Sequence, residues 1–289
     1  MSAAAAALVF VAAVVHAVWN LLSKQASRAG GAAFVWLVAT TATLLYLPVA
    51  ATVAVVVSPH MGVPQLVFVA GTAVLHTAYF TCLQSGYRVG DLSLVYPLAR
   101  GTGPLLASLA AIALFGERPG PLGLAGIFLV TVGVFVLGMP NSTGSAPRPQ
   151  PAAVVYGLLT GVLIASYTVW DSYAVSALAI PPLLYMWCND AGRALLLTPL
   201  ASRNRSEVRA LWHGYRWHVL GTAVLSPLSY ILVLTALTFS PVSAIAPTRE
   251  LSVLLAVLLG GRLLAEGNLP RRMLAAAAIA GGVLVIAVW

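Results

Sequence analysis

Ten apolar stretches, each long enough to cross a lipid bilayer, dominate this sequence. A membrane-spanning helix needs about 20 predominantly apolar residues. The stretches cover residues 4–23, 32–57, 64–86, 92–115, 120–138, 152–177, 180–201, 217–238, 242–264 and 270–288. Their length and their lack of alternating polarity predict helices and not a β-barrel. The sequence therefore predicts an all-α integral membrane protein with ten transmembrane helices.

The composition supports this class and excludes others. Hydrophobic residues make up 60% of the 289 residues and charged residues 8%, whereas about a quarter of a soluble domain is charged. A water-soluble globule is thus excluded, and the net charge of +8 is assigned to cytoplasmic loops and not to nucleic-acid binding. Two cysteines give no disulfide framework. The first residues lack the basic region of a cleavable signal peptide, so we interpret them as the start of the first span.

The two halves of the chain resemble each other. A Pro-, Ser- and Gly-rich linker, residues 140–151, separates a first half, 1–139, from a second half, 152–289. Residues 18–20, Val-Trp-Asn, are echoed by Val-Trp-Asp at 169–171, and the interval from Arg100 to Glu117 equals that from Arg249 to Glu266. Five spans in each half would make the second half run opposite to the first. The pattern predicts two inverted five-helix repeats, a design used by many secondary transporters.

The loop charges agree with this inversion. Loops that follow even-numbered spans hold only Arg118, whereas those that follow odd-numbered spans hold Lys24, Arg28, Arg88, Arg148, Arg203, Arg205, Arg209, Arg216, Arg271 and Arg272. The positive-inside rule then places the odd loops in the cytoplasm and both termini outside. Trp212, Trp217 and Trp289 lie at span ends, where they are typical of interfacial anchors.

The fourth span contains an arginine among helix-breaking residues. Pro97, Gly101, Gly103 and Pro104 surround Arg100; proline removes a backbone donor, and an arginine inside the membrane is costly unless it is paired or hydrated. We expect the prolines and glycines to bend this helix as a hinge. The second copy of the element keeps fewer of them, so we expect the first copy to be the more broken helix and to lie nearer the substrate.

Six charged residues fall at membrane depth, and their charges sum to zero: Arg100, Asp171, Asp190, Arg193, Arg249 and Glu250. This balance indicates mutual pairing or a shared polar cavity. Asp190 and Arg193 are spaced i, i+3 and can pair on one helix, whereas Arg100 and Asp171 need partners on other helices, water or a ligand. Each repeated arginine is equally consistent with substrate binding and with an ion pair between the halves. Because burial disfavours a charged carboxylate, Asp171 is the first candidate for a proton-coupling group and Asp190 the second.

Polar and aromatic residues form stripes on three spans. His16, Trp19 and Asn20 lie on one helix face, Tyr167, Trp170 and Asp171 on another, and His76 with Tyr79 on a third. Such stripes could line a central cavity, although helix packing explains the tryptophans equally well and a hydrogen-bonded core position is the simpler interpretation of either histidine. The candidate substrate-binding residues are His16, Trp19, Asn20, His76, Tyr79, Tyr96, Arg100, Tyr167, Trp170, Asp171, Arg249 and Glu250.

Catalytic motifs are missing from the sequence. The histidines have no metal-ligand spacing with the acidic residues, and neither a zinc-protease motif nor a Walker sequence occurs. We therefore expect no enzyme activity, no metal, no cofactor and no ATP-driven transport by this chain. Residues 116–119, Gly-Glu-Arg-Pro, are interpreted as a helix stop followed by proline.

Residues 16–20 (His-Ala-Val-Trp-Asn), 90–100 (Gly-Asp-Leu-Ser-Leu-Val-Tyr-Pro-Leu-Ala-Arg) and 115–117 (Phe-Gly-Glu) resemble EamA-type members of the drug/metabolite transporter superfamily. The second half departs from the family pattern at 265–267, Ala-Glu-Gly, where Gly-Glu is usual. The resemblance implies a ten-helix carrier with a central cavity that moves amino acids, other metabolites, nucleotide sugars or lipid-linked groups, commonly outward. It also implies termini inside, opposite to the loop charges.

The expected function is secondary transport, with export the favoured direction, of a small polar or amphipathic metabolite, such as an amino-acid-like or other anionic or zwitterionic compound, by alternating access. The alternative is a flippase for a lipid-linked substrate, which predicts a cleft between helices with basic residues at its mouth. A non-transporting membrane subunit or enzyme is a third reading. The expected partners are a small-molecule substrate, the bilayer and a coupling proton, for a monomer or homodimer in the inner or plasma membrane.

Overall fold

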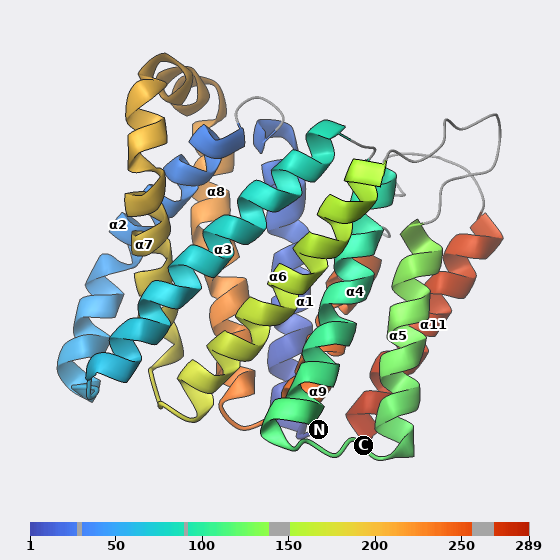
Figure 1. The fold of residues 1–289 in the computed structure, drawn as a ribbon. Coiled ribbons are helices and arrows are strands. Elements are labelled where there is room, and N and C mark those ends of the chain that lie inside the picture. The colour runs from blue at the N-terminus through green and yellow to red at the C-terminus, as the bar shows by residue number, and fades with distance from the viewer. Residues whose placement is uncertain (28–30, 90–91, 139–150, 256–268, 289) are drawn as a thin grey trace.

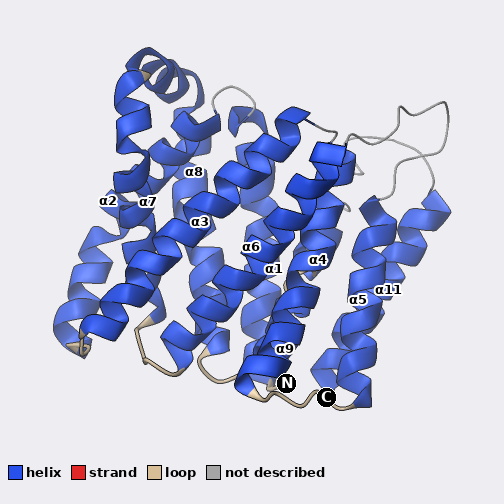
Figure 2. Ribbon diagram, in the orientation of Figure 1, coloured by secondary structure: helices blue, strands red, loops and turns tan. Residues whose placement is uncertain are grey.

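The computed structural model describes residues 1–27, 31–89, 92–138, 151–255 and 269–288. These residues form helices, turns and short loops, with no β-strand among them (Figure 2). The helices are α1 (Ala3–Ser27), α2 (Gly31–Val57), α3 (Val63–Val89), α4 (Leu92–Phe115), α5 (Pro121–Gly138), α6 (Pro151–Ser176), α7 (Pro182–Arg203), α8 (Arg205–Leu237), α9 (Val242–Thr248) and α11 (Leu269–Val288).

Six of these helices, α1, α2, α3, α4, α6 and α8, are long and apolar enough to cross a membrane, and α5 and α11 contain shorter apolar segments. The apolar stretches of the sequence thus predicted the helices well, and the limits of α4 agree to the residue. The helices carry many large apolar side chains on their outer surface, such as Val55, Val56 and Leu195, each more than 70% exposed. An apolar exterior of this kind suits lipid and not water, so the chain is a multi-pass membrane protein.

The start of α8 differs from the sequence prediction. The span was expected to begin at residue 217, after a basic loop, but the helix begins at Arg205 and changes direction at Tyr215, whose φ of −132° and ψ of 23° are not helical. The first segment is helical because Val208, Leu211 and Tyr215 share one face and pack on α2, next to Ala33 and Phe34. A search for long apolar runs misses such a segment, because only one of its faces is apolar.

The sequence predicted that the first repeated element is the more interrupted helix, and the structure shows the opposite. α4 is continuous through Arg100, whereas α9 ends at Thr248 and a turn at 249–250 precedes a further helical segment at 251–255. The second copy is therefore the more broken one. A Cβ atom on Gly101 would lie 2.8 Å from the Phe135 ring, and one on Gly103 would lie 2.7 Å from Ile164. These glycines allow α5 and α6 to approach α4 closely; their role as a hinge, with Pro97 and Pro104, stays a prediction.

The most extensive helix contacts among the described residues join the two halves of the chain. α4 packs on α6, α5 on α11, α1 on α8, α2 on α7 and α3 on α6. The pair α5–α11 stands at one edge of the bundle (Figure 1). There a Cβ atom on Gly126 would lie 2.9 Å from the Gly282 carbonyl oxygen, so small residues let the two backbones meet.

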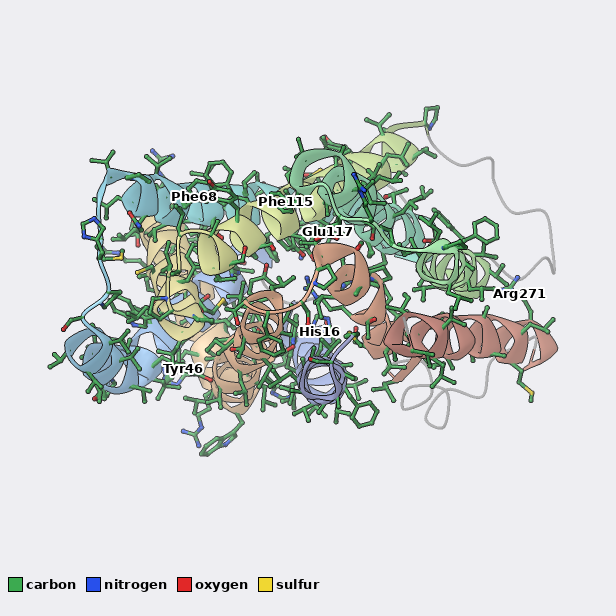
Figure 3. The ribbon with its side chains drawn as sticks, turned by 90° about the horizontal axis from the view of Figure 1, so that it is seen from below. His16, Tyr46, Phe68, Phe115, Glu117 and Arg271 are labelled. Carbon is green, nitrogen blue, oxygen red and sulfur yellow. The ribbon has the colours of Figure 1, made fainter. Side chains whose placement is uncertain are left out.

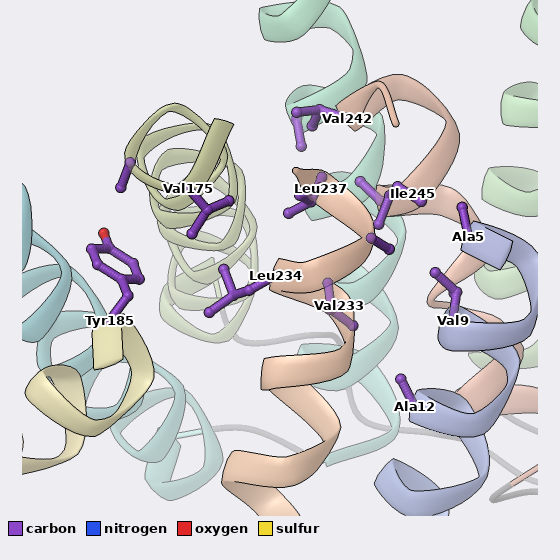
Figure 4. Packing of buried hydrophobic residues seen from close by; sticks show 14 of the residues in the cluster. Ala5, Val9, Ala12, Val175, Tyr185, Val233, Leu234, Leu237, Val242 and Ile245 are labelled. Carbon is purple, nitrogen blue, oxygen red and sulfur yellow. The ribbon is translucent and has the colours of Figure 1, made fainter. Parts of the chain in front are cut away.

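The largest buried apolar cluster lies where α1, α6 and α8 converge (Figure 4). It includes Val9, Val175 and Leu234, together with Ile245 of α9. Both chain ends and the α4–α5, α6–α7 and α8–α9 connections lie at one end of the bundle, and the start of α8 lies at the other (Figure 1). The cluster holds together the helices that carry the polar site described below.

Candidate functional site

Asp171, on α6, is the centre of a buried polar cluster. Its side chain is fully buried, and three groups from three other helices contact it. The Tyr185 hydroxyl of α7 donates to Oδ1 at 2.7 Å, the Tyr230 hydroxyl of α8 donates to Oδ2 at 2.6 Å, and His76 Nε2 of α3 lies 3.0 Å from Oδ2. Buried carboxylates require such partners. Asp171 therefore joins α3, α6, α7 and α8 through one group.

Aromatic rings surround this carboxylate. The His76 ring lies 4.2 Å from the Tyr167 ring and 5.4 Å from the Tyr230 ring, and Tyr79 packs edge-on against Tyr167 at 5.5 Å. The structure thus brings together four predicted site residues, His76, Tyr79, Tyr167 and Asp171. It also adds Tyr185 and Tyr230, which carried no sequence signal, because single tyrosines on separate apolar spans give no pattern.

The two repeated arginines lie near each other, next to His16. Arg100 Nη1 donates to Glu250 Oε1 at 3.5 Å, and Arg100 Nη2 lies 3.0 Å from His16 Nε2. Because arginine has no acceptor, the His16 Nε2 atom must accept this bond. The Arg100–Glu250 pair joins the first half to the second, as one of the two sequence interpretations predicted. The Arg249 guanidinium lies over the Tyr230 ring, 5.1 Å from its centroid.

A small polar cavity lies between α1, α4, α8 and the end of α9. Its polar lining consists of His16, Arg100, Ser229, Arg249 and Ser252. Its volume is about 10 Å³, close to the minimum needed for one water molecule and far below the roughly 300–1,000 Å³ of a ligand pocket. A metabolite can enter only if these helices move apart. The cavity nevertheless gathers two guanidinium groups, one from each half, which is suitable chemistry for an anion.

Tyr230 connects the cavity to the Asp171 cluster. Its hydroxyl binds the carboxylate of Asp171, while its ring face holds the guanidinium of Arg249. The carboxylate cluster and the arginine pair are therefore separated by a single side chain. A movement of the Tyr230 side chain would alter both contacts.

Other predicted residues lie at the edge of the cavity or away from it. Trp19 packs edge-on against His16 at 4.8 Å, and its buried Nε1 has no hydrogen-bond partner among the described residues. Asn20 is half-buried on the next position of α1. Glu250 Oε2 is buried and has no hydrogen-bond partner within the described part of the chain. The side chain of Tyr96, like that of Pro97, lies outside the described residues.

Trp170 lies in a different place from the one expected. Its ring stacks on Phe68 at 4.1 Å, its Nε1 donates to the Phe68 carbonyl oxygen at 2.9 Å, and it lines an apolar groove of about 740 Å³ between α3, α4 and α6. The twelve residues that line this groove are all uncharged: Phe68, Leu106, Leu109, Ala110, Leu114, Phe115, Val162, Ala165, Ser166, Val169, Trp170 and Tyr173.

The second candidate coupling residue belongs to a separate cluster. Arg193 Nη1 lies 3.3 Å from Asp190 Oδ1 on α7, so the predicted local pair is confirmed. Asp190 is 4% exposed, and it does not line the cavity next to His16. The two candidate coupling residues therefore lie at distinct positions, and of these two only Asp171 is linked to the arginine pair, through Tyr230.

Glu117 has a role that the sequence interpretation missed. Its Oε1 accepts a hydrogen bond from the Val242 N–H at 2.7 Å, and its Oε2 accepts one from the Ser243 N–H at 2.9 Å. The residue thus caps the first turn of α9 from the α4–α5 loop, at the end of the bundle that carries both chain ends (Figure 3). Gly116, with φ of +67°, makes the turn that aims it there. The sequence feature that could have indicated this role is the position of Glu117 at the end of the repeated interval that begins at Arg100.

Comparisons with known proteins agree with this architecture. A solved crystal structure superposes on 99% of this chain and 96% of its own, with a TM-score of 0.79 at 17% sequence identity, which shows a shared fold. A search of the curated proteins gives no match. Residues 3–139 match the EamA-like transporter family. The matched residues include the motifs at 16–20 and 90–100, so the first half of the chain is similar to the EamA-like transporter family.

Proposed function

We propose that the protein is a secondary transporter that exports a small anionic or zwitterionic metabolite by alternating access. The carrying observation is the convergence of Arg100 and Arg249, one from each half, with His16 on one buried polar cavity. Charged donors in a low-dielectric site bind carboxylate or phosphate groups strongly. Among the described residues, the Arg249 guanidinium lies over the Tyr230 ring and near the Glu250 carboxylate, whereas Arg100 forms a direct ion pair with Glu250.

The proposed machinery is ten transmembrane helices in two inverted repeats, 1–139 and 152–289, joined by the linker 140–151. The contacts support this, because exchanging each helix for its counterpart maps the pair α1–α8 onto α6–α3 and the pair α2–α8 onto α7–α3. The pairs α2–α7, α4–α9 and α5–α11 map onto themselves. In such carriers the two repeats rock around a site near the midplane, and the small cavity requires a movement of this kind before a metabolite can bind.

We infer that a proton drives the cycle through Asp171. The carboxylate lies next to His76 and is linked to Arg249 by Tyr230. Protonation of Asp171 would weaken its acceptor capacity for the tyrosine hydroxyls and free the ring under Arg249 to move. We place the basic loops in the cytoplasm and the termini outside, and the protein in the cell membrane, without enzyme activity.

The first experiment is a ligand screen on purified protein followed by transport. The shift in Tm is measured with succinate, L-glutamate, glycerol 3-phosphate and L-alanine, with mannitol as a neutral control. The compounds that raise Tm identify the chemical class of the substrate. Counterflow of the radiolabelled hit in proteoliposomes then compares the parent with Arg249→Gln and with Arg118→Gln, an exposed arginine remote from the cavity. Loss of a charge-assisted bond of about 1.5–3 kcal/mol predicts an approximately tenfold or greater fall for Arg249→Gln and no change for Arg118→Gln. If Arg249→Gln, Arg100→Ala and Asp171→Asn all leave uptake unchanged, the site is wrong.

A lipid-linked substrate is the second candidate, because the apolar groove next to Trp170 is open on the side of the bundle and could hold a lipid chain. The flippase hypothesis also predicted basic residues at the mouth of the cleft, and the residues that line the groove have no charge. Reconstitution with a fluorescent phospholipid and a membrane-impermeant quencher separates the two candidates. Protein-dependent exposure of the inner-leaflet lipid would favour the flippase.

A further inference from the structure

We propose that the first segment of α8, residues 205–214, together with Arg216, is a binding site for the headgroups of anionic phospholipids. Figure 1 shows this segment curling across the end of the bundle next to the end of α7, before α8 turns down between the other helices. The change of direction is at Tyr215. A helix in this position lies at the level of the lipid headgroups and not in the hydrocarbon core.

The segment has two distinct faces. Val208, Leu211 and Tyr215 pack against Phe34 and Leu37 of α2, which fixes the segment on the protein. Arg205 and Arg209, spaced four apart, lie on one side of the segment, and both side chains are exposed, as is that of Arg216 just beyond the change of direction. The protein therefore buries the apolar face itself and presents the basic face outward.

The outward face is strongly cationic. Arg203, Arg205, Arg209 and Arg216 are all exposed, and Glu207 is the acidic residue among them. With Arg203, at the end of α7, four positive charges and one negative charge give a net +3 within the 14 residues 203–216. Each basic residue near an anionic membrane surface contributes about 1 kcal/mol. This charge is complementary to phosphatidylglycerol or similar lipids and not to zwitterionic phosphatidylcholine.

Two exposed tryptophans mark the depth of the segment. Trp217 is 71% exposed and Trp212 is 38% exposed, which would be unfavourable in water for side chains of this size. Tryptophan is enriched where hydrocarbon meets headgroups. The Arg216 guanidinium lies 5.4 Å from the centroid of the Trp217 ring, so one apolar ring and one phosphate-binding group occupy the same place. This combination fits a lipid molecule better than a free anion.

The test uses the full-length protein in neutral detergent. Native mass spectrometry measures the affinity for phosphatidylglycerol and for phosphatidylcholine with the same acyl chains, in the parent, in the triple variant R205Q/R209Q/R216Q and in R118Q. Removing three charges at about 1 kcal/mol each predicts an affinity for phosphatidylglycerol lower by on the order of a hundredfold in the triple variant. R118Q and all phosphatidylcholine affinities are expected to be unchanged.

A second triple variant, R205K/R209K/R216K, keeps the charge and is expected to retain phosphatidylglycerol binding within about threefold, because the surface attraction depends mainly on charge. Equal phosphatidylglycerol binding by the parent and by a folded R205Q/R209Q/R216Q variant would refute the site. Inorganic phosphate is added in parallel. If it displaces phosphatidylglycerol at similar concentrations, the site recognises a free anion and the lipid assignment is wrong. None of these readouts depends on the proposed transport.

Discussion

Replacing Asp171 by asparagine tests the central cluster most directly. The side chains have nearly the same shape, so the substitution removes charge and leaves the packing unchanged. In the parent, both carboxylate oxygens accept hydrogen bonds, Oδ1 from Tyr185 and Oδ2 from Tyr230, with His76 also at Oδ2. An asparagine places an NH₂ group at one of these positions, and the tyrosine hydroxyl or the imidazole next to it must rotate or change tautomer to accept.

The expected loss follows from the three bonds. Hydrogen bonds to charged groups contribute about 1.5–3 kcal/mol and neutral ones about 0.5–1.5 kcal/mol. If all three bonds re-form as neutral ones, each loses about 1 kcal/mol, and the total is about 3 kcal/mol. With about 2 °C per kcal/mol for a chain of this size, Tm should fall by about 6 °C.

Thermal unfolding in neutral detergent, followed by tryptophan fluorescence, measures the shift. Tyr173→Phe, on the same helix but 40% exposed, is the control and should stay within about 1 °C of the parent, since exposed substitutions have small effects. The double variant Asp171→Asn/Tyr185→Phe should show a coupling energy above about 0.5 kcal/mol. A Tm for Asp171→Asn equal to that of the parent would refute the cluster as described.

Three further predictions concern other contacts. Glu117→Gln should lower Tm by about 4 °C or more, because an amide cannot accept both N–H groups of the α9 first turn with a charge; Arg118→Gln, one residue away, is the scanning-fluorimetry control. Tyr230→Phe keeps the ring under Arg249 and loses the hydroxyl bond to Asp171, so Tm should fall by about 3–6 °C, while a fall below 1 °C would contradict that bond. Gly126→Val should reduce the monodisperse yield in size-exclusion chromatography, because its Cβ would lie 2.9 Å from a carbonyl oxygen, whereas Gly281→Ala, with open space around it, should leave the yield unchanged; overpacking costs about 1–3 kcal/mol.

The helices of this protein were largely predictable, because a bilayer imposes length and apolarity on each span. α4 was placed to the residue. The segment at 205–214 was not, since its apolar face meets α2 and its other face is basic. The sequence identified helix-breaking residues in both repeated elements but wrongly predicted that the first element would be the more interrupted helix. Tertiary packing of Gly101 and Gly103 against neighbouring helices explains their presence in a continuous α4.

The candidate site was predictable in its charged residues and not in its partners. Charges inside a membrane are rare enough that Arg100 and Asp171 stood out, and both have partners on other helices, as expected. Which helices supply those partners depends on the packing, so Tyr185 and Tyr230 could not be identified in advance. The same holds for Glu117, whose two carboxylate oxygens accept hydrogen bonds from backbone N–H groups of α9, more than a hundred residues away in the sequence.

The contacts between the halves also bear on how the chain is made. Within the first half, α1 touches α2 little and α3 touches α4 little, while each has a large interface with α6, α7 or α8. During synthesis the first five helices therefore enter the membrane before their packing partners exist. Assembly must wait for the second half, and the nascent protein relies on lipid or on the insertion apparatus to hold these helices apart from one another until α8 arrives. A ribosome stalled after residue 151 would leave a set of inserted helices with little tertiary structure beyond the α4–α5 contact to protect it from membrane proteases.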